Sequence, residues 1–369
     1  MILNQPFDLL VIGGGINGVG IACDAAGRGL RVLLCESGDL GGATSSASSK
    51  LIHGGFRYLE HYEFRLVAEA LAEREVLLAK APHIIWPLRF VLPHTSGQRP
   101  RWMIRAGLFL YDHLARRRAI PGSRALNLTT SPHAATLRPG IARGFTYWDC
   151  RVDDARLVVL NARAAANAGA MILTRTRFDA ARPAGDLWQA NLFNTRTGEA
   201  RTIAARAIVN AAGPWTADVL GRIGTSQPAI PRPAATLRLV KGSHIVVPRL
   251  TEGNDAFILQ TSDGRVVFVL PYEERFSLIG TTDEPFTGDP AHVAISPPET
   301  TYLLDAVAEI FAMPPRAADI VWSYAGVRPL YDDDPTKPAK AVTRDYHLDL
   351  QATDGAGCPH RCIPISRSD

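Results

Sequence analysis

A glycine-rich turn directly after the first apolar segment constrains this chain more than any other feature. Residues 7–12 read FDLLVI, and glycines follow at Gly13, Gly15 and Gly18, with helical character from there to Gly29. In a dinucleotide-binding turn the first glycine makes the tight turn, the second lets a pyrophosphate approach the backbone, and the third lets the helix pack on the strand. The helix N-terminus offers free N–H groups and a partial positive charge to phosphates. The spacing therefore predicts a dinucleotide site.

A second apolar segment, residues 31–36, ends in Glu36, 21 positions after Gly15. An acid at about this distance accepts a hydrogen bond from a ribose hydroxyl in such folds. We therefore predict that Glu36 binds the ribose, the alternative being a solvated strand end. The glycines alone do not separate FAD from NAD.

The loop of residues 37–50 consists largely of small and hydroxyl-bearing residues. Its composition alone would also fit a flexible linker. Because it follows the acid directly, we interpret it as wrapping the cofactor, since small side chains permit close approach and hydroxyl groups bond phosphate oxygens. The predicted contacts are Thr44, Ser45, Ser46 and Ser49.

The totals of the sequence limit the class of protein. A chain of 369 residues is long enough for two domains, and 46% hydrophobic and 21% charged residues are ordinary for a globular protein. A net charge of +4 is too mild to indicate nucleic acid. Five cysteines without framework spacing indicate reduced thiols in a cytosolic setting. We expect no metal site, because the Cys358 to Cys362 cluster lacks a partner pair.

Residues 43–60, ATSSASSKLIHGGFRYLE, carry a longer signature. This stretch closely resembles the FAD-dependent glycerol-3-phosphate dehydrogenases of the aerobic, quinone-reducing kind, within the larger family of D-amino-acid-oxidase-like flavoproteins. The resemblance implies an enzyme with an α/β fold, in which a Rossmann-like FAD-binding domain carries an antiparallel-sheet substrate cap. It extends from about residue 7 to about residue 350, through residues 148–157, 241–244, 280–283 and 326–329.

Both domains are expected to be discontinuous in sequence. In the cap, Asp263-Gly264 between two segments rich in β-branched and aromatic residues predicts a hairpin. Residues 153–169 are predicted to be helical, with acids at the start and a glycine at the end. The predicted division is residues 1–60, 146–225 and 320–354 for the FAD-binding domain, 61–145 and 226–319 for the cap, and 355–369 for an anomalous tail.

The resemblance implies oxidation of sn-glycerol 3-phosphate to dihydroxyacetone phosphate by hydride transfer to FAD, with electrons passed to a membrane quinone. Arginine binds phosphate in a bidentate way, and the resemblance assigns this role to Arg57, Arg328 and Arg344, with Tyr58 nearby. Arg328 is also expected to stabilise the C2 oxygen as it loses its proton. His244 is the candidate base, since imidazole titrates near neutrality. A structural histidine and surface ion pairs are the alternatives.

The resemblance further places His53 beside the flavin. Gly213 and Trp215 are expected to neighbour FAD as well, because a strand that ends in small residues lets the backbone lie against a cofactor. Two alternatives stay open, an oxidase that uses O₂ and a non-catalytic FAD-binding protein. An amine oxidase would leave the arginines unexplained.

Residues 99–118 combine an aromatic apolar run with flanking arginines. The run is shorter than the ~20 residues that span a bilayer. It is expected either to lie in the interface, with its arginines on anionic headgroups, or to form a buried helix with a basic end. The resemblance favours the first, with the protein peripheral on the cytoplasmic face of the cell membrane. A homodimer is one assembly that the sequence leaves open.

The resemblance stops after Asp354. Members of the family continue with a strand, a Gly-Gly-Lys-x-Thr-Thr-Tyr-Arg segment and a helical domain, whereas residues 355–369 show no period. We hypothesise a frameshift or a truncated gene. The lost segment is expected to weaken FAD binding and to leave an open sheet edge.

Overall fold

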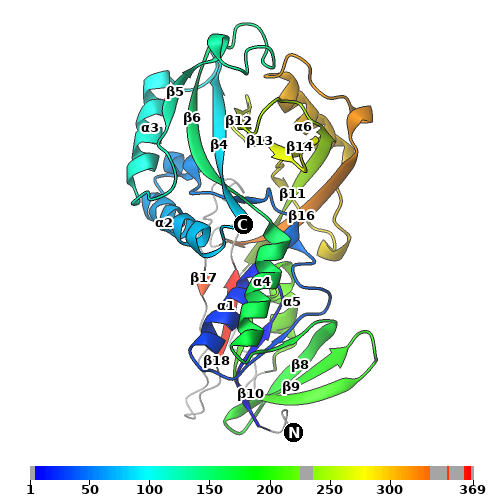
Figure 1. Cartoon of the computed structure of the whole chain (residues 1–369). Helices are drawn as coiled ribbons and strands as arrows, with labels where there is room; N and C mark the ends of the chain where they lie inside the picture. Colours follow the sequence, from blue (N-terminus) through cyan, green and yellow to red (C-terminus); the bar gives the residue numbers. More distant parts are fainter. Residues whose placement is uncertain (1–4, 225–235, 333–346, 349–360, 367–369) are drawn as a thin grey trace.

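Two β-sheets form the framework of the protein, one in the lower and one in the upper half of Figure 1. The computed structural model describes residues 5–224, 236–332, 347–348 and 361–366. Among these residues no helix is both long and apolar enough to cross a bilayer. The predicted α/β fold class is confirmed by this architecture.

The first sheet has the order β17-β18-β10-β1-β2-β7, and β9 and β8 continue from β10. β1 lies between β2 and β10 and runs parallel to both, as a dinucleotide-binding sheet requires. Its strands are β1 (Phe7–Ile12), β2 (Val32–Cys35), β7 (Met171–Leu173), β8 (Thr176–Ala184), β9 (Leu187–Asn194), β10 (Ala200–Asn210), β17 (His347–Leu348) and β18 (Arg361–Ser366).

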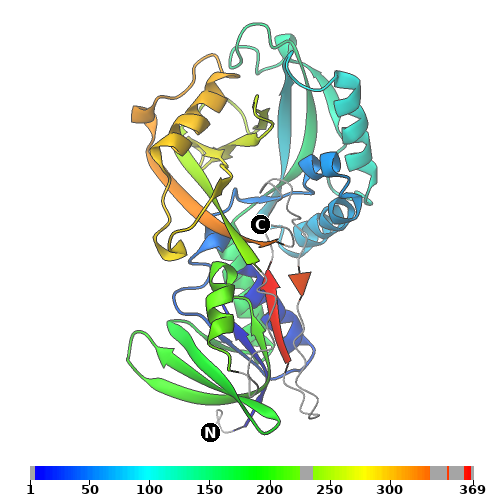
Figure 2. The same cartoon turned by 180° about the vertical axis from the view of Figure 1, so that it is seen from behind.

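Both faces of this sheet are covered, which is why β1 is apolar from Leu9 to Ile12. Helices α1 (Ile16–Gly27) and α4 (Asp154–Asn167) pack on one face, where Val11 meets Val19 and Val158. Helix α5 (Thr216–Gly221) and the β8–β9 hairpin cover the other face, where Leu10 meets Trp188. Figure 2 shows α5 and this hairpin from the side hidden in Figure 1.

The second sheet has the order β15-β11-β14-β13-β12-β4-β6-β3, with β16 paired to β11 and β5 to β6. Helices α2 (Phe64–Lys80) and α3 (Arg101–His113) pack on one face and α6 (Pro297–Ala308) on the other. Its strands are β3 (Leu51–Ile52), β4 (Ile85–His94), β5 (Arg124–Asn127), β6 (Arg143–Val152), β11 (Thr236–Pro248), β12 (Ala256–Gln260), β13 (Val266–Tyr272), β14 (Phe276–Gly280), β15 (Glu284–Pro285) and β16 (Trp322–Asp332).

The local predictions in these regions hold. The hairpin at Asp263-Gly264 joins β12 to β13, and Gly264 has φ +78°, which favours glycine. The helix predicted from residue 153 is α4, whose N-cap Asp153 accepts a hydrogen bond from the Arg156 N–H at 3.3 Å. The domain boundaries given above stay a proposal.

The expectation of an open sheet edge is wrong. β18 pairs in parallel with β10, from Ala207 opposite Arg361 to Asn210 opposite Pro364, and β17 pairs with β18. The tail therefore supplies a strand at the position where we expected unpaired backbone groups. Its lack of a sequence period gave no sign of this, because a parallel strand does not require alternating polar and apolar residues.

Candidate active site

The glycine turn between β1 and α1 has the geometry predicted for it. Gly13 has φ +109°, and a Cβ there would lie 2.4 Å from the Ala211 carbonyl oxygen. A Cβ on Gly18 would lie 1.9 Å from the Gly13 oxygen, so only glycine lets α1 approach the turn. A Cβ on Gly15 would lie 3.0 Å from the Ser45 hydroxyl, so this loop approaches the turn closely. Gly15 lines a large cavity, and its lack of a side chain lets a pyrophosphate approach the backbone.

Glu36, the predicted ribose acceptor, lies at the end of β2 against this turn. Its carboxylate accepts hydrogen bonds from the Gly14 N–H and the Gly38 N–H, each at 2.7 Å. The acid therefore holds the turn and the start of the next loop together, and it faces the same cavity as both.

The loop of residues 44–49 connects the two sheets. Ser45 Oγ accepts from the Ile16 N–H at 3.0 Å, next to the glycine turn. Thr44 donates to the carbonyl oxygen of Val327 on β16 at 2.7 Å, and Ser49 Oγ is hydrogen-bonded to His244 Nε2 at 2.8 Å. Hydroxyl groups that we predicted to contact the cofactor thus also hold this loop to the second sheet.

Asp154, at the first position of α4, anchors the same loop from the other side. Its two carboxylate oxygens accept from Ser48 Oγ and from Lys50 Nζ, both at 2.8 Å. Lys50 also donates to the Ser46 carbonyl oxygen at 3.1 Å. In the sequence, Asp154 is recognisable only as part of a helix start. Nothing local to it signals a partner more than a hundred positions away.

A large cavity of about 1390 Å³ separates the glycine turn from the second sheet. Gly18 is not on its wall, because it packs against Gly13. Arg344 lies outside the described residues. The remaining predicted site residues all line the cavity, namely Gly13, Gly15, Glu36, Thr44, Ser45, Ser46, Ser49, His53, Arg57, Tyr58, Gly213, Trp215, His244 and Arg328.

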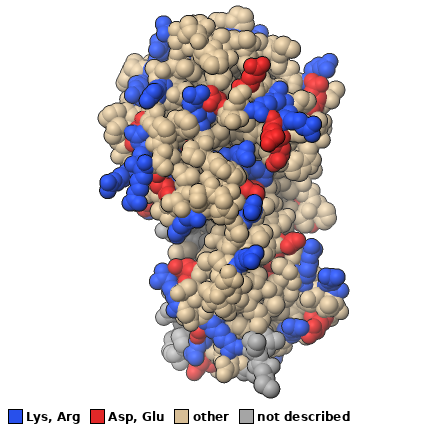
Figure 3. Space-filling model, viewed as in Figure 1, with Lys and Arg blue, Asp and Glu red and all other residues tan. Residues whose placement is uncertain are grey.

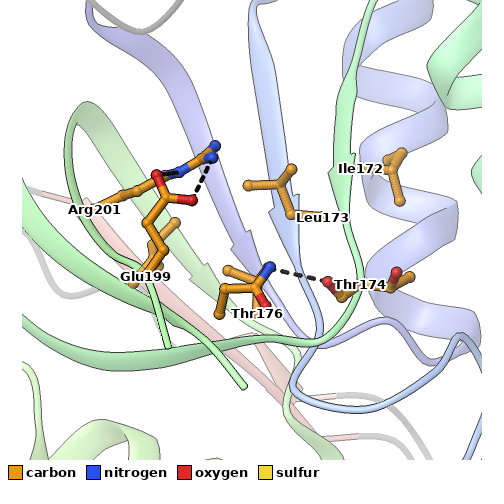
Figure 4. A pocket seen from close by; sticks show the side chains of 8 residues that line it. Ile172, Leu173, Thr174, Thr176, Glu199 and Arg201 are labelled. Carbon is orange, nitrogen blue, oxygen red and sulfur yellow. Dashed lines mark hydrogen bonds and ion pairs between the residues drawn. The ribbon is translucent and has the colours of Figure 1, made fainter. Parts of the chain in front are cut away.

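A second cavity of about 200 Å³ lies beside β7 and the ends of β9 and β10. Figure 4 shows Glu199 and Arg201 there, paired with each other. It contains none of the predicted site residues, and its charged groups are already paired. The large cavity is therefore the candidate site.

Arg57 differs from the other cations on the cavity wall. It makes no hydrogen bond or ion pair with any residue that the structure describes, although it faces the cavity. Every other lysine or arginine on the wall pairs with a carboxylate, the pairs being Lys50–Asp154, Arg74–Asp149, Arg177–Asp179, Arg222–Asp218, Arg265–Asp263 and Arg328–Asp283. An anionic ligand would find its uncommitted partner at Arg57.

His244 is buried in the wall, with 3% of its surface exposed. Its ring stacks on Tyr324 at 4.8 Å, and its Nδ1 has no partner among the described residues. Burial, together with the charges of Arg328 and Lys50, lowers the pKa of His244 to about 3. The imidazole is therefore neutral at physiological pH and is a weak base.

A buried ion pair fixes the loop that carries His53 and Arg57. Asp149 accepts from Arg74 Nη1 at 2.6 Å and from the Tyr111 hydroxyl at 2.7 Å. The Gly54 N–H donates to that hydroxyl at 2.8 Å and to Asp149 at 3.3 Å. Burial and the Asp149 charge raise the pKa of Tyr111, which keeps its hydroxyl protonated. None of the sequence patterns described above predicts this cluster. Its only signal is three polar residues in apolar surroundings.

Comparison with known proteins identifies the family. The family model described as FAD dependent oxidoreductase matches residues 8–347. The chain belongs to the FAD-dependent oxidoreductases. It is 58% identical to a glycerol-3-phosphate dehydrogenase of Pseudomonas aeruginosa over 353 residues, which are 96% of this chain and 67% of that protein. It is 53% identical to a D-erythritol 1-phosphate dehydrogenase of Brucella abortus over 352 residues, or 95% of this chain and 69% of that protein.

A solved structure agrees with this assignment. The glycerol-3-phosphate dehydrogenase from Bacillus halodurans, complexed with FAD, superposes with a TM-score of 0.70 at 28% identity, over 98% of this chain and 61% of that chain. The chain thus spans about two thirds of the length of the curated relatives named above.

The residues present fit FAD. Gly15, which lines the cavity, and the N-terminus of α1 form a cradle for a pyrophosphate, and the Glu36 carboxylate lies beside it. The cavity continues from there past Thr44 and Gly213 to the second sheet, which provides room for a flavin. FAD is accordingly the cofactor of this oxidoreductase, and the contacts of individual residues stay a prediction.

Proposed function

We propose that this oxidoreductase oxidises sn-glycerol 3-phosphate at C2 to dihydroxyacetone phosphate. The observation that carries the proposal is Arg57, a cation on the cavity wall without a carboxylate partner among the described residues. A phosphate monoester supplies the two oxygens that a guanidinium binds. The names of the relatives support the same substrate class.

The proposed binding roles follow from which donors are committed. Arg57 binds the phosphate, with Tyr58 beside it and Arg344, outside the described residues, as a further donor. Arg328 uses Nη2 for the Thr282 carbonyl oxygen at 3.1 Å and Asp283 at 3.2 Å. These two bonds fix the orientation of the guanidinium. We assign its remaining N–H groups to the C2 oxygen of the substrate, where charge develops as the proton leaves.

FAD, when bound, supplies the hydride acceptor for C2, so the protein has to take the hydroxyl proton. His244 is our candidate because it is neutral and its Nδ1 is free of partners among the described residues. Its pKa of about 3 weighs against this role, since a base works best with a pKa near the operating pH. His244→Gln decides the matter. If reduction of the flavin slows about 100-fold or more in this variant, His244 is the base. If only stability falls, His244 is a structural histidine.

The test of substrate class is an anaerobic absorbance spectrum of the FAD-loaded chain before and after glycerol 3-phosphate. Bleaching of the flavin band supports the proposal, and glycerol without phosphate serves as the control ligand.

Arg57→Ala should raise the half-saturating substrate concentration about 100-fold. Arg177→Ala, which removes a cation already paired with Asp179, should leave it unchanged. Equal effects of the two variants would contradict the assignment of Arg57.

D-Erythritol 1-phosphate is the second candidate substrate. The relative from Brucella abortus that bears this name is 53% identical over 95% of the chain. Both substrates present a phosphate to Arg57 and a secondary hydroxyl to Arg328, so they differ in length and not in charge. The ratio of kcat/KM for the two decides which the enzyme prefers.

We propose a membrane quinone as electron acceptor, with O₂ as the alternative. Reoxidation of the reduced enzyme by a soluble quinone analogue under anaerobic conditions supports the first. Stoichiometric hydrogen peroxide from aerobic turnover at a similar rate would support the oxidase.

We also propose that α3 docks on an anionic membrane surface, with the protein on its cytoplasmic side. Trp102 is 70% exposed and Phe109 53%, one above the other on the outer face of the helix. Figure 3 shows basic side chains gathered along the edge of the upper half where Figure 1 places α3. Trp102→Ser with Phe109→Ser should weaken sedimentation with anionic vesicles at least tenfold while stability stays unchanged. This proposal is refuted if the wild-type protein does not sediment with such vesicles at low salt.

A further inference from the structure

Glu299 lies at the N-terminus of α6 and is 3% exposed, which is rare for a carboxylate. Its Oε2 accepts from the Ser296 N–H and hydroxyl, both at 2.8 Å, in a capping box. A helix cap alone would leave the rest of the carboxylate in solvent. Here the other side of the carboxylate is buried against β11 and the segment after β14.

Two of the motifs that carry the family resemblance, residues 241–244 and 280–283, meet at this carboxylate. Ser243 Oγ donates to Glu299 Oε1 at 2.8 Å, and Thr282 Oγ1 donates to the same oxygen at 2.7 Å. Lys241 Nζ pairs with Oε2 at 2.7 Å. The Ser243 N–H in turn donates to Thr282 Oγ1 at 2.9 Å. Glu299 is thus the common acceptor of residues 241–244 and 280–283.

The network continues to the cavity wall. Thr282, whose hydroxyl is bound to Glu299, uses its carbonyl oxygen to accept from Arg328 Nη2. Asp283, the next residue, accepts from the same nitrogen. On β11, Ser243 directly precedes His244. Glu299, which lies outside the cavity, therefore fixes two backbone segments. One precedes His244, and the other accepts a hydrogen bond from Arg328.

The charge of Glu299 is well compensated. Burial by itself would raise its pKa, but hydrogen bonds from Lys241, Thr282 and Ser296 outweigh burial and lower the pKa to about 2. The group is ionised at every pH at which the protein would work. An ionised acceptor makes stronger and more directional hydrogen bonds than a neutral one.

We propose that Glu299 is a positioning residue, which orients Arg328 toward the substrate through Thr282. The proposal rests on the substrate role given to Arg328 above. The alternative is that Glu299 only caps α6, in which case its bonds to Ser243 and Thr282 would matter for stability alone.

Three variants separate these possibilities. Glu299→Gln keeps the shape but turns one acceptor into a donor that faces hydroxyl and ammonium donors. Thr282→Val removes the hydroxyl that links Glu299 to the cavity wall. Ser296→Ala is the matched control, because it removes a bond on the helix side and leaves the wall side intact.

The first measurement is amide hydrogen exchange of residues 280–283 in the FAD-loaded chain without substrate. We expect faster exchange, by about tenfold or more, in Glu299→Gln and Thr282→Val and wild-type exchange in Ser296→Ala. The second is the steady-state kcat for glycerol 3-phosphate. We expect a decrease of about tenfold in the first two variants with a smaller change in KM, because Arg328 is assigned to charge that develops in the transition state, and a change below twofold in Ser296→Ala.

The proposal is overturned if Glu299→Gln lowers the unfolding temperature while both exchange and kcat match those of Ser296→Ala. If Glu299→Gln does not fold, Thr282→Val carries the same test. Exchange needs no substrate, so its outcome stands even if wild-type flavin is not reduced by glycerol 3-phosphate. That result would refute the proposed substrate and leave the exchange data to decide on Glu299.

Discussion

The two walls of the cavity are built in different ways. On the nucleotide side, the bonds that shape the turn join residues close in sequence: 22 positions separate Gly14 from Glu36, and 29 separate Ile16 from Ser45. On the opposite side, 195 positions separate Ser49 from His244, and the Thr44 bond to Val327 spans 283. The first wall is a local motif, whereas the second is an assembly of distant segments.

Assembly of distant segments needs fixed acceptors, and buried carboxylates provide them. Asp154 holds Ser48 and Lys50, Asp149 holds the Gly54 loop through Tyr111, and Glu299 holds Ser243 and Thr282. Burying a charge is costly unless it is paired and hydrogen-bonded, and each of these is. We therefore expect the second wall to be sensitive to loss of charge and the first to added volume.

The largest effect should come from Asp149→Asn. Removing the charge of Asp149 leaves Arg74 with the more distant Glu75 carboxylate at 3.9 Å, and should lower the free energy of unfolding by about 3–5 kcal/mol. Urea unfolding of the FAD-loaded chain measures this. Asp24→Asn, which breaks an exposed pair with Arg28, is the control and should cause no measurable change. Similar losses in both variants would mean that burial of the pair is irrelevant.

The first wall can be tested within one helix. Gly18→Ala places a methyl group against the Gly13 oxygen and should cost about 1–3 kcal/mol of stability, with loss of FAD binding measured by absorbance after gel filtration. At Gly20 nothing lies within 4 Å of an added Cβ. Gly20→Ala should thus leave FAD binding intact and raise stability by up to about 1 kcal/mol, since alanine favours helix. If Gly18→Ala retains FAD as well as Gly20→Ala does, close packing is not what this glycine provides.

A smaller effect is a dependence of stability on pH, which comes from His244 on the second wall. The pKa of His244 is about 3 in the folded protein and 6.5 in its ordinary state, so the unfolded chain binds the proton first. Stability is complete above the ordinary pKa and falls as pH decreases toward the folded value, by about 1 kcal/mol for the first pH unit. His244→Gln should flatten that part of the profile between about pH 6.5 and 5.5. If the variant keeps the wild-type slope of stability against pH, groups other than His244 cause that slope.

How far the sequence predicts the structure follows the same division. The strand, glycine turn, helix and acid of residues 7–36 were predictable because each has a local physical requirement. The hairpin at Asp263-Gly264 was predictable for the same reason. Glu299 was readable only as half of a capping box, from Ser296 three positions earlier. Its bonds to β11 and to Thr282 depend on how distant strands meet, which no local pattern encodes. The same holds for the pairing of β18 with β10, because the two strands lie far apart in sequence.

The loop of residues 44–49 belongs to both walls at once. It bonds to the glycine turn through Ser45, to β16 through Thr44, and to β11 through Ser49. A ligand that displaces this loop at one wall therefore strains its bonds at the other wall. Linkage is reciprocal, so any factor by which the cofactor changes the affinity for substrate is also the factor by which substrate changes the affinity for cofactor. This loop is the segment through which such a coupling would pass.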